Sequence, residues 1–461
     1  MKPVLCIDFG STFTKVTAID VDTPSILARA QSFTTIHDDI NFGFNRALEQ
    51  IIKVTGIQEF NERYACSSAA GGLKMIAIGL VPQLTAEAAK RAALSAGAKV
   101  LETFSFELNE YEIKKIERIK PDIILFTGGI DGGNTKVVTA NAQRLTTMNH
   151  RCPLIYAGNK VIADDIAALL REHRWDVSIA SNVMPTLNEL NIHSAQNLIR
   201  KIFLDHIVVA KGLSTVQACI DNILMPTPSA VLLGAELLSK GYLSNPGIGE
   251  LMIVDVGGAT TDVHSVADGA PRQSNVIMKG LAEPLIKRTV EGDLGARYSL
   301  DALIQGVGID VVADVLKVPP EVVKQMCDDL TNHPEQFMEE PGLMKTLDDV
   351  AAEIAIRESV TRHAGFLEVH YTPFGTVYQQ TGKDLSMVHH VIGTGGPLIH
   401  HSNIKSALKA SQYDLKQPMS LKPSNSRFYL DQNYILAAMG LLSINHPKAA
   451  LQLLKENLKE V

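Results

Sequence analysis

The sequence lacks the marks of several large classes of protein. Its 461 residues contain five scattered cysteines and no C-x-x-C pair, which fits a reducing cytoplasm and argues against an iron–sulfur cluster or a structural zinc site. No apolar run approaches the roughly 18 residues that a membrane helix needs. A charged-then-apolar signal pattern is also missing from the first residues. We therefore expect a cytoplasmic protein with no membrane partner.

An excess of positive charge is absent as well. The formal net charge is −7 at pH 7, with 43 Lys and Arg against 50 Asp and Glu, whereas a nucleic-acid-binding surface needs clustered basic residues. No Walker A pattern occurs, and neither Gly247-Ile-Gly nor Gly306-Val-Gly completes G-x-G-x-x-G. With 46% hydrophobic and 20% charged residues, the composition is that of an ordinary globular enzyme.

What the chain does have is an acid-tipped hairpin signal near its start. An apolar run ends at Asp8, turns over Gly10, and returns past Lys15 through residues rich in β-branched side chains. The backbone N–H groups of such a turn, together with a lysine, form a cradle for phosphate oxygens. A hard carboxylate suits Mg²⁺. The stretch therefore predicts a β-hairpin that binds phosphate and a metal ion.

A second stretch later in the chain repeats this plan. Four residues of the first copy recur at identical offsets in the second, namely Asp8, Gly10, Thr14 and Val16 as Asp255, Gly257, Thr261 and Val263. Asp262 stands where the first copy has Lys15. The repetition predicts a duplicated fold with one anionic ligand held between the two copies.

A third glycine-rich turn follows a predicted strand and precedes a predicted helix, at Gly393-Thr394-Gly395-Gly396. Glycine there would let the backbone approach the base and ribose of a nucleotide closely. Small-residue helices are predicted near the end of each half, at 229–240 and 434–442.

Between the two hairpins, predicted strands and helices alternate from about residue 60 to about residue 208. This alternation is typical of parallel βαβ units and predicts an inserted α/β domain. Beyond the second hairpin, 277–292 and most of 300–364 are predicted to be helical.

The three glycine-rich motifs resemble the phosphate-1, phosphate-2 and adenosine motifs of the actin/Hsp70/sugar-kinase ATPase superfamily. Over its whole length the chain also resembles the MutL/glutamate-mutase accessory family, in Leu125-Phe-Thr-Gly-Gly-Ile-Asp-Gly-Gly, Glu291-Gly-Asp-Leu-Gly and Gly393-Thr-Gly-Gly. The resemblance implies an α/β fold of two ribonuclease-H-like, actin/Hsp70-type ATPase halves around a nucleotide cleft. It implies a first half at 1–58 plus 211–245, an inserted α/β domain at 59–210, and a second half at 246–461.

The resemblance also implies roles for particular residues, with ATP and Mg²⁺ as cofactors. The catalytic residues would be Asp8, Lys15 and Asp255, and Mg²⁺ would be held by Asp8, Asp255 and Asp262. The nucleotide would be bound by Gly10, Ser11, Thr12, Gly257, Gly258, Thr260, Thr261, Gly393, Thr394, Gly395 and Gly396. The residue that polarises the attacking water stays open among Thr227, Ser229 and Glu236.

Other candidate residues have weaker support for a functional role. Asp131, in a glycine-rich turn after a strand, is as compatible with a docking surface as with a ligand site. Neighbouring histidines at His389-His390 and His400-His401 invite a metal hypothesis, but adjacent residues on a strand point to opposite faces. Lys287 and Glu291 lie four apart on a predicted helix, where they would contact nucleoside or stabilise the helix.

The leading hypothesis is an ATP-dependent reactivating chaperone for an adenosylcobalamin-dependent mutase, of the glutamate mutase or aminomutase type. ATP hydrolysis would drive release of damaged cofactor, the inserted domain would grip the partner, and homodimer formation is left open. A small-molecule kinase of the sugar-kinase type is the alternative, although no acid stands in a sugar-kinase-like context. An actin-like filament is a third possibility, and an activator of a radical dehydratase would need paired cysteines that the chain lacks.

Overall fold

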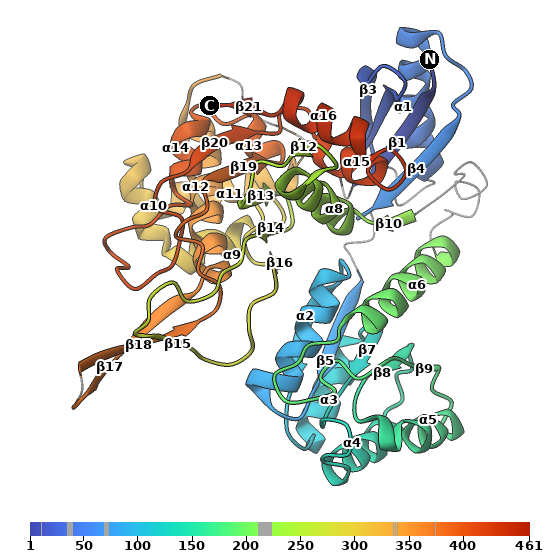
Figure 1. The fold of residues 1–461 in the computed structure, drawn as a ribbon. Coiled ribbons are helices and arrows are strands. Elements are labelled where there is room, and N and C mark those ends of the chain that lie inside the picture. Colours follow the sequence, from blue (N-terminus) through green and yellow to red (C-terminus); the bar gives the residue numbers. More distant parts are fainter. Residues whose placement is uncertain are drawn as a thin grey trace. The chain divides into compact units, whose positions relative to one another are not determined.

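The computed structural model describes residues 1–10, 12–34, 40–68, 73–210, 224–334, 336, 338, 340–373 and 375–461. These residues divide into two compact units, and Figure 1 labels their helices and strands. Unit 1 comprises Met1–Asp22, Ile26–Ala230 and Gly280–Ala282, and unit 2 comprises Thr23–Ser25, Val231–Lys279 and Glu283–Val461. Each unit is built around its own mixed sheet. None of the described helices combines the length and the apolar character that crossing a membrane requires.

The first sheet of unit 1 has the strand order β10-β4-β1-β2-β3. Its strands are β1 Pro3–Phe9, β2 Phe13–Asp20, β3 Ser25–Phe33, β4 Glu62–Ser67 and β10 Leu224–Pro226. The central strand β1 runs antiparallel to β2 and parallel to β4, and β4 runs parallel to β10. Helix α1, Ile40–Thr55, buries Phe44, Ala47 and Ile51 in the same apolar core as the inner face of this sheet.

The second sheet of unit 1 is wholly parallel and has the order β6-β5-β7-β8-β9. Its strands are β5 Lys74–Ile78, β6 Lys99–Phe104, β7 Ile123–Phe126, β8 Leu154–Tyr156 and β9 Val177–Ile179. The helical segments are η1 Pro82–Ala86, α2 Glu87–Ser95, α3 Glu110–Ile119, α4 Lys136–Thr146, η2 Lys160–Ile162, α5 Ala163–Glu172 and α6 His193–Ala210. This 2-1-3-4-5 order is that of a doubly wound α/β sheet.

The predicted run of parallel βαβ units is confirmed by this second sheet. Its start differs from the prediction, because β4 pairs with β1 and so belongs to the first sheet although it was placed inside 59–210. The inserted sheet begins with β5. The division of the chain into three domains stays a prediction.

The main sheet of unit 2 has the order β16-β14-β13-β19-β20-β21. Its strands are β13 Leu251–Val256, β14 Thr261–Val266, β16 Ile286–Glu291, β19 His390–Thr394, β20 Arg427–Leu430 and β21 Lys459–Glu460. Strand β13 runs antiparallel to β14 and parallel to β19, and β19 runs parallel to β20. Around β13 the strands therefore repeat the arrangement around β1, and the predicted duplication is confirmed. The fold is the predicted α/β class, with a ribonuclease-H-like sheet in each half.

The prediction of helix over 277–292 is wrong. This part of the chain forms β15, Val276–Met278, and β16. The six residues of β16 include the β-branched Ile286, Thr289 and Val290, and they pair with the open edge of β14 along its whole length. A short amphipathic segment beside an unpaired strand edge gains ladder hydrogen bonds that a lone helix would not.

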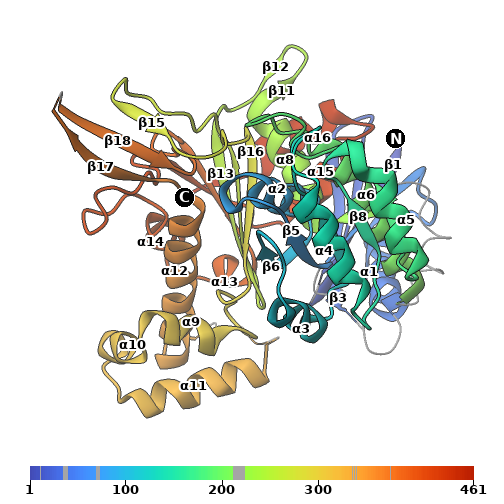
Figure 2. The same cartoon turned by 90° about the horizontal axis from the view of Figure 1, so that it is seen from below.

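The rest of unit 2 consists of helices, the first of which begins in unit 1, and two small sheets. The helices are α8 Thr227–Lys240, α9 Leu300–Val307, α10 Ile309–Leu316, α11 Pro320–Asn332, α12 Leu343–His363, α13 Gly396–Ile399, α14 Ile404–Lys409, α15 Ile435–Leu442 and α16 Pro447–Asn457. The small sheets contain β11 Gly241–Tyr242, β12 Asn245–Pro246, β17 Phe366–Thr372 and β18 Gly375–Thr381, with β15 joined to β18. Figure 2 shows α12 between the β17–β18 hairpin at one end and α9 to α11 at the other.

Helices α8 and α15, which lie where the sequence predicted small-residue helices, pack closely through such residues. A Cβ atom on Gly234 would lie 2.7 Å from the carbonyl oxygen of Leu436 and 3.4 Å from the backbone nitrogen of Gly440. Interhelical contact at this distance excludes larger side chains. The first four residues of α8 belong to unit 1, and the remainder belongs to unit 2.

Candidate functional site

The first hairpin has the turn that the sequence predicted. Gly10 N–H donates to the carbonyl oxygen of Phe13 at 3.1 Å. A Cβ atom on Gly10 would lie 2.5 Å from that same oxygen, so only glycine fits. Asp8 is the cross-strand partner of Lys15, whose Nζ lies 3.9 Å from Asp8 Oδ2. The predicted acid and cation therefore meet beside the turn, while Ser11 lies outside the described residues.

Asp8 is held by two further donors that the sequence analysis did not connect with it. Thr227 Oγ1 donates to Asp8 Oδ1 at 2.6 Å, and Cys66 Sγ donates to the same oxygen at 3.4 Å. Burial and then the negative charge of Asp8 raise the pKa of Cys66 well above its ordinary value, so the thiol keeps the proton that it donates. Among the three residues left open in the α8 segment, Thr227 is thus the one with a hydrogen bond to Asp8.

The second hairpin repeats the geometry of the first. Gly257 N–H donates to the carbonyl oxygen of Thr260 at 2.9 Å, and a Cβ atom on Gly257 would lie 2.9 Å from that oxygen. Asp255 is the cross-strand partner of Asp262, as Asp8 is of Lys15. The two turns are therefore built by the same hydrogen bond and the same glycine requirement.

The polar side chains of the second hairpin are largely engaged within the sheet. Asp262 Oδ1 accepts from Arg288 Nε at 2.8 Å and lies 2.6 Å from Arg288 Nη2, and Thr260 Oγ1 donates to Asp262 Oδ2 at 3.2 Å. Thr261 is fully buried and donates to the carbonyl oxygen of Leu294 at 2.6 Å. These contacts favour structural roles for Asp262 and Thr261, and their predicted roles at metal and phosphate stay predictions.

The segment after β16 braces the second turn, which the sequence analysis did not foresee. Gly258 O accepts from the backbone N–H groups of Arg297 at 2.9 Å and Tyr298 at 2.8 Å, and Gly257 O accepts from that of Ala296 at 3.0 Å. The Arg297 guanidinium, buried with its partner, binds both oxygens of Asp348 at 2.6 and 2.9 Å. The Glu291-Gly-Asp-Leu-Gly motif therefore leads into a support for the turn.

The third motif lies directly beside the second hairpin. Gly395 has φ +102°, and a Cβ atom on it would lie 2.1 Å from the carbonyl oxygen of Val256 and 2.9 Å from Asp255 Oδ1. Thr394 is buried and stands in register with Asp255. At Gly393 a Cβ atom would instead meet Leu408 and Leu398 side chains, at 2.9 and 3.0 Å. The structure thus brings Asp255 and Gly395 together. The contacts of Gly393 favour a packing role, and its predicted role at the nucleotide stays a prediction.

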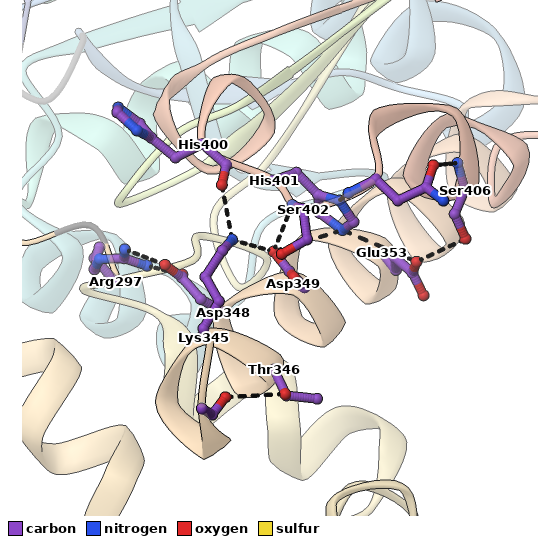
Figure 3. Close-up of polar contacts among 12 residues, drawn as sticks. Arg297, Lys345, Thr346, Asp348, Asp349, Glu353, His400, His401, Ser402 and Ser406 are labelled. Carbon is purple, nitrogen blue, oxygen red and sulfur yellow. Dashed lines mark hydrogen bonds and ion pairs between the residues drawn. The ribbon is translucent and has the colours of Figure 1, made fainter. Parts of the chain in front are cut away.

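Helix α12 fixes the chain that follows Gly396, the first residue of α13 (Figure 3). Lys345 Nζ donates to the carbonyl oxygen of His400 at 2.7 Å and also to Asp349 Oδ1. His401 accepts from the backbone N–H of Asn403 at Nδ1, 2.9 Å away. Within the part of the chain that the structure describes, no group of three or more His, Cys, Asp or Glu residues has the geometry of a metal site. These contacts favour the structural reading of the histidine pair.

The carboxyl end of β20 adds two residues that sequence reasoning missed. Asp431 accepts from the backbone N–H groups of Ile435 at 2.9 Å and Leu436 at 3.1 Å, which caps α15. Burial, then the charges of Asp255 and Asp431, raise the pKa of Tyr434. Tyr434 is therefore near Asp255, and nothing in the sequence pattern signals this.

Two other sequence candidates make contacts within the chain. Although burial opposes it, hydrogen bonds from Asn182 and Lys160 lower the pKa of Asp131, whose Oδ1 accepts from Asn182 Nδ2 at 2.9 Å and from the backbone of Lys160 at 3.1 Å. Lys287 and Glu291 lie on strand β16 and not on a helix. Their ion-pair partners are Glu283 and Arg362, respectively.

Comparison with known proteins identifies the family. The family model described as "MutL protein" matches residues 4–458. Protein MutL of Clostridium tetanomorphum is 46% identical over 463 residues, covering 100% of both chains. The chain belongs to the MutL family.

Solved structures with a similar course of the chain are far more distant from this MutL-family protein. An activator of the 2-hydroxyisocaproyl-CoA dehydratase from Clostridium difficile, with bound ADPNP, is 11% identical, covers 98% of this chain and 97% of its own, and has a TM-score of 0.30. The diol dehydratase-reactivating factor in its nucleotide-free form is 10% identical, covers 97% and 100%, and has a TM-score of 0.37. Similarity at this level carries no conclusion about function.

Proposed function

We propose that this MutL-family protein is an accessory ATPase that reactivates an adenosylcobalamin-dependent mutase of the glutamate mutase or aminomutase type. ATP hydrolysis would drive the release of damaged cofactor, in the cytoplasm that the scattered cysteines suggest. The observation that carries the proposal is the repeated hairpin. Asp8 and Asp255 occupy the same position beside turns with the same hydrogen bond and the same required glycine.

The chemistry of the first turn suits the phosphate end of ATP. Lys15 would neutralise charge on the phosphates, and the backbone N–H groups of a tight glycine turn would donate to phosphate oxygens. In the second half, Gly395 leaves the backbone beside Asp255 without a side chain, which suits the close approach of a nucleoside. Each half therefore supplies an acid and, beside it, a glycine whose backbone no side chain covers.

The carboxylates also suit a magnesium ion. Asp8 Oδ1 accepts hydrogen bonds from the neutral donors Thr227 and Cys66, and its Oδ2 faces Lys15. Hard oxygen ligands of this kind are those that Mg²⁺ prefers. Asp8 and Asp255 would hold the ion, which would supply charge neutralisation at the transferring phosphoryl group.

The inserted domain is our candidate for contact with the mutase. Three large apolar side chains lie in segments that follow strands at the carboxyl edge of its sheet, with exposed fractions of 37% for Ile130, 64% for Val161 and 62% for Leu187. Hydrogen bonds tie these loops together, from Asp131 N to the carbonyl oxygen of Pro185 and from Lys160 N to Asp131. Exposed apolar side chains gathered on a rigid edge are typical of protein–protein contacts.

The test is phosphate release by the full-length protein, with and without a glutamate mutase or aminomutase whose cobalamin has lost its adenosyl group. We expect ATP hydrolysis and recovery of mutase activity once fresh adenosylcobalamin is added. D8N and D255N should each lower hydrolysis by about 100-fold, as removal of a preorganised charged group does. Transfer of phosphate to a sugar would instead favour the kinase alternative, and absence of nucleotide binding would refute the proposal.

A further inference from the structure

Asp8 is fixed by residues that come from distant parts of the chain but from adjacent strands. Thr227 is 219 positions away and Cys66 is 58 positions away. Strands β1, β4 and β10 run parallel side by side, with Asp8 in register with Cys66 and Pro226 in register with Ser67. Because carboxyl ends of parallel strands meet at one edge of a sheet, the fold brings these three side chains together.

The two donors contact one oxygen of the Asp8 carboxylate, and Lys15 lies beside the other. Both Thr227 and Cys66 donate to Oδ1, and Lys15 Nζ lies nearer to Oδ2, at 3.9 Å. A carboxylate whose one oxygen is held by two donors from the sheet has a fixed rotamer, with its second oxygen directed elsewhere. The hydroxyl bond at 2.6 Å is the stronger of the two, since a thiol is a weak donor.

We propose that Thr227 and Cys66 are positioning residues that orient Asp8 so that Oδ2 is presented to the metal–nucleotide complex. The inference rests on the proposed ATPase function and adds to it two residues outside the glycine motifs. Thr227 contributes most, and Cys66 supplements it. Thr227 also opens helix α8 directly after β10, so the pairing of β10 with β4 sets the position of its hydroxyl.

The experiment compares T227V, T227S and C66A in the full-length protein. T227V removes the hydroxyl while keeping the branched shape, and T227S keeps the donor. T135V is the matched control. Thr135 directly precedes helix α4, so that it lies at a helix start as Thr227 does, but its side chain is exposed and makes no capping hydrogen bond. The readouts are Mn²⁺ affinity with a non-hydrolysable ATP analogue by electron paramagnetic resonance, affinity for the analogue by calorimetry, and kcat for ATP hydrolysis.

For T227V we expect Mn²⁺ binding weakened by about 10-fold and kcat lowered by about 10- to 100-fold, the usual effect of losing a hydrogen bond to a charged group. Affinity for the analogue itself should change by less than about threefold, because Thr227 does not touch the phosphates in this proposal. T227S should restore both quantities to within about threefold. C66A should lower both Mn²⁺ affinity and kcat by about two- to fivefold, because a thiol is a weak donor, and T135V should match the wild type.

The inference is overturned if T227V equals T135V in Mn²⁺ affinity and kcat, or if T227S is as impaired as T227V. If T227V does not fold, C66A decides: Mn²⁺ affinity and kcat equal to those of the wild type would then overturn the inference. Wild-type protein that neither binds nor hydrolyses ATP refutes the proposed function together with this inference. Wild-type activity with unaffected variants refutes the inference alone.

Discussion

At the scale of single residues, the candidate site depends on glycines that other residues could not replace. Gly395 is the clearest case, since both its positive φ and its contact with Val256 exclude a side chain. Buried ionisable groups lie elsewhere in unit 2. Lys383 is fully buried, and its Nζ donates to the carbonyl oxygens of Pro284 and Leu285, each at 2.7 Å. Each feature leads to a measurable expectation.

Replacing Gly395 with Ala should destabilise unit 2 by more than about 2 kcal/mol, because the new Cβ would meet backbone atoms and φ +102° strains any L-residue. Urea unfolding measures the change. The control is G306A, a helical position with open space around it, where alanine should be neutral or stabilise by up to about 1 kcal/mol. Equal unfolding midpoints for the two variants would contradict the expectation.

The stability of the protein should rise with pH above neutrality because of Lys383. Burial, followed by the charge of Lys287, lowers the pKa of Lys383 to about 7, whereas the unfolded chain keeps this proton to about pH 10.4. The unfolded state therefore binds more protons between these values, and stability should increase by up to about 1.4 kcal/mol per pH unit. K383M should lose this slope in urea unfolding between pH 7.5 and 9.5. An identical pH dependence in K383M and wild type would rule the effect out.

At the scale of secondary-structure elements, helix α12 supports both glycine motifs of unit 2. Asp348 holds Arg297 beside Gly258, and Lys345 holds the chain that follows α13. The helix thus connects the turn of the second hairpin with the loop that contains Gly395. Supports of this kind fix a site without touching its ligand.

Breaking the buried Arg297–Asp348 pair should be costly. R297M leaves the Asp348 carboxylate buried without its partner, and we expect a loss of about 3–5 kcal/mol in unfolding free energy. The double variant R297M/D348L should recover much of this loss, because no unpaired charge remains. A double-mutant cycle by urea unfolding checks it, and strict additivity of the two single changes would contradict the expectation.

Local chemistry explains how much of this arrangement could be predicted. The two hairpins were predictable because their turns need glycine, acids mark their strand ends, and the offsets repeat. Strand β16 was not, since a six-residue segment becomes a strand only beside the open edge of β14. The contacts of Asp8 with Cys66 and Thr227 could not be predicted from the sequence either, because they depend on the order of the strands in the sheet and not on spacing along the chain.

At the scale of the whole molecule, the chain combines two sheets of equivalent strand order with an inserted parallel sheet. The duplication places two acids, Asp8 and Asp255, at equivalent positions in their sheets, but the side chains opposite them differ. Lys15 faces Asp8, while the corresponding Asp262 is paired with Arg288 inside the sheet. The inserted sheet exposes apolar side chains on loops far in sequence from both hairpins. Nucleotide chemistry and partner contact should therefore be separable by substitution.

The triple variant I130D/V161D/L187D should abolish reactivation of the mutase while leaving affinity for ATP within about twofold of wild type. Three charges on an apolar contact would each have to be desolvated on binding. The matched control is Y111D, at an exposed tyrosine on α3 of the same domain, which should reactivate normally. Recovery of mutase activity measures reactivation, and calorimetry measures affinity for the nucleotide. Joint loss of both in the triple variant would argue against this separation.

The thiol of Cys66 also allows local opening of the first sheet at β4 and β10 to be measured without an attached probe. It is buried and carries its proton, so a small alkylating reagent reaches it only when β4 or β10 transiently detaches. Mass spectrometry of the modified peptide would report how often that happens. Slower alkylation in the presence of a nucleotide would reveal ligand-induced tightening in the unmodified protein.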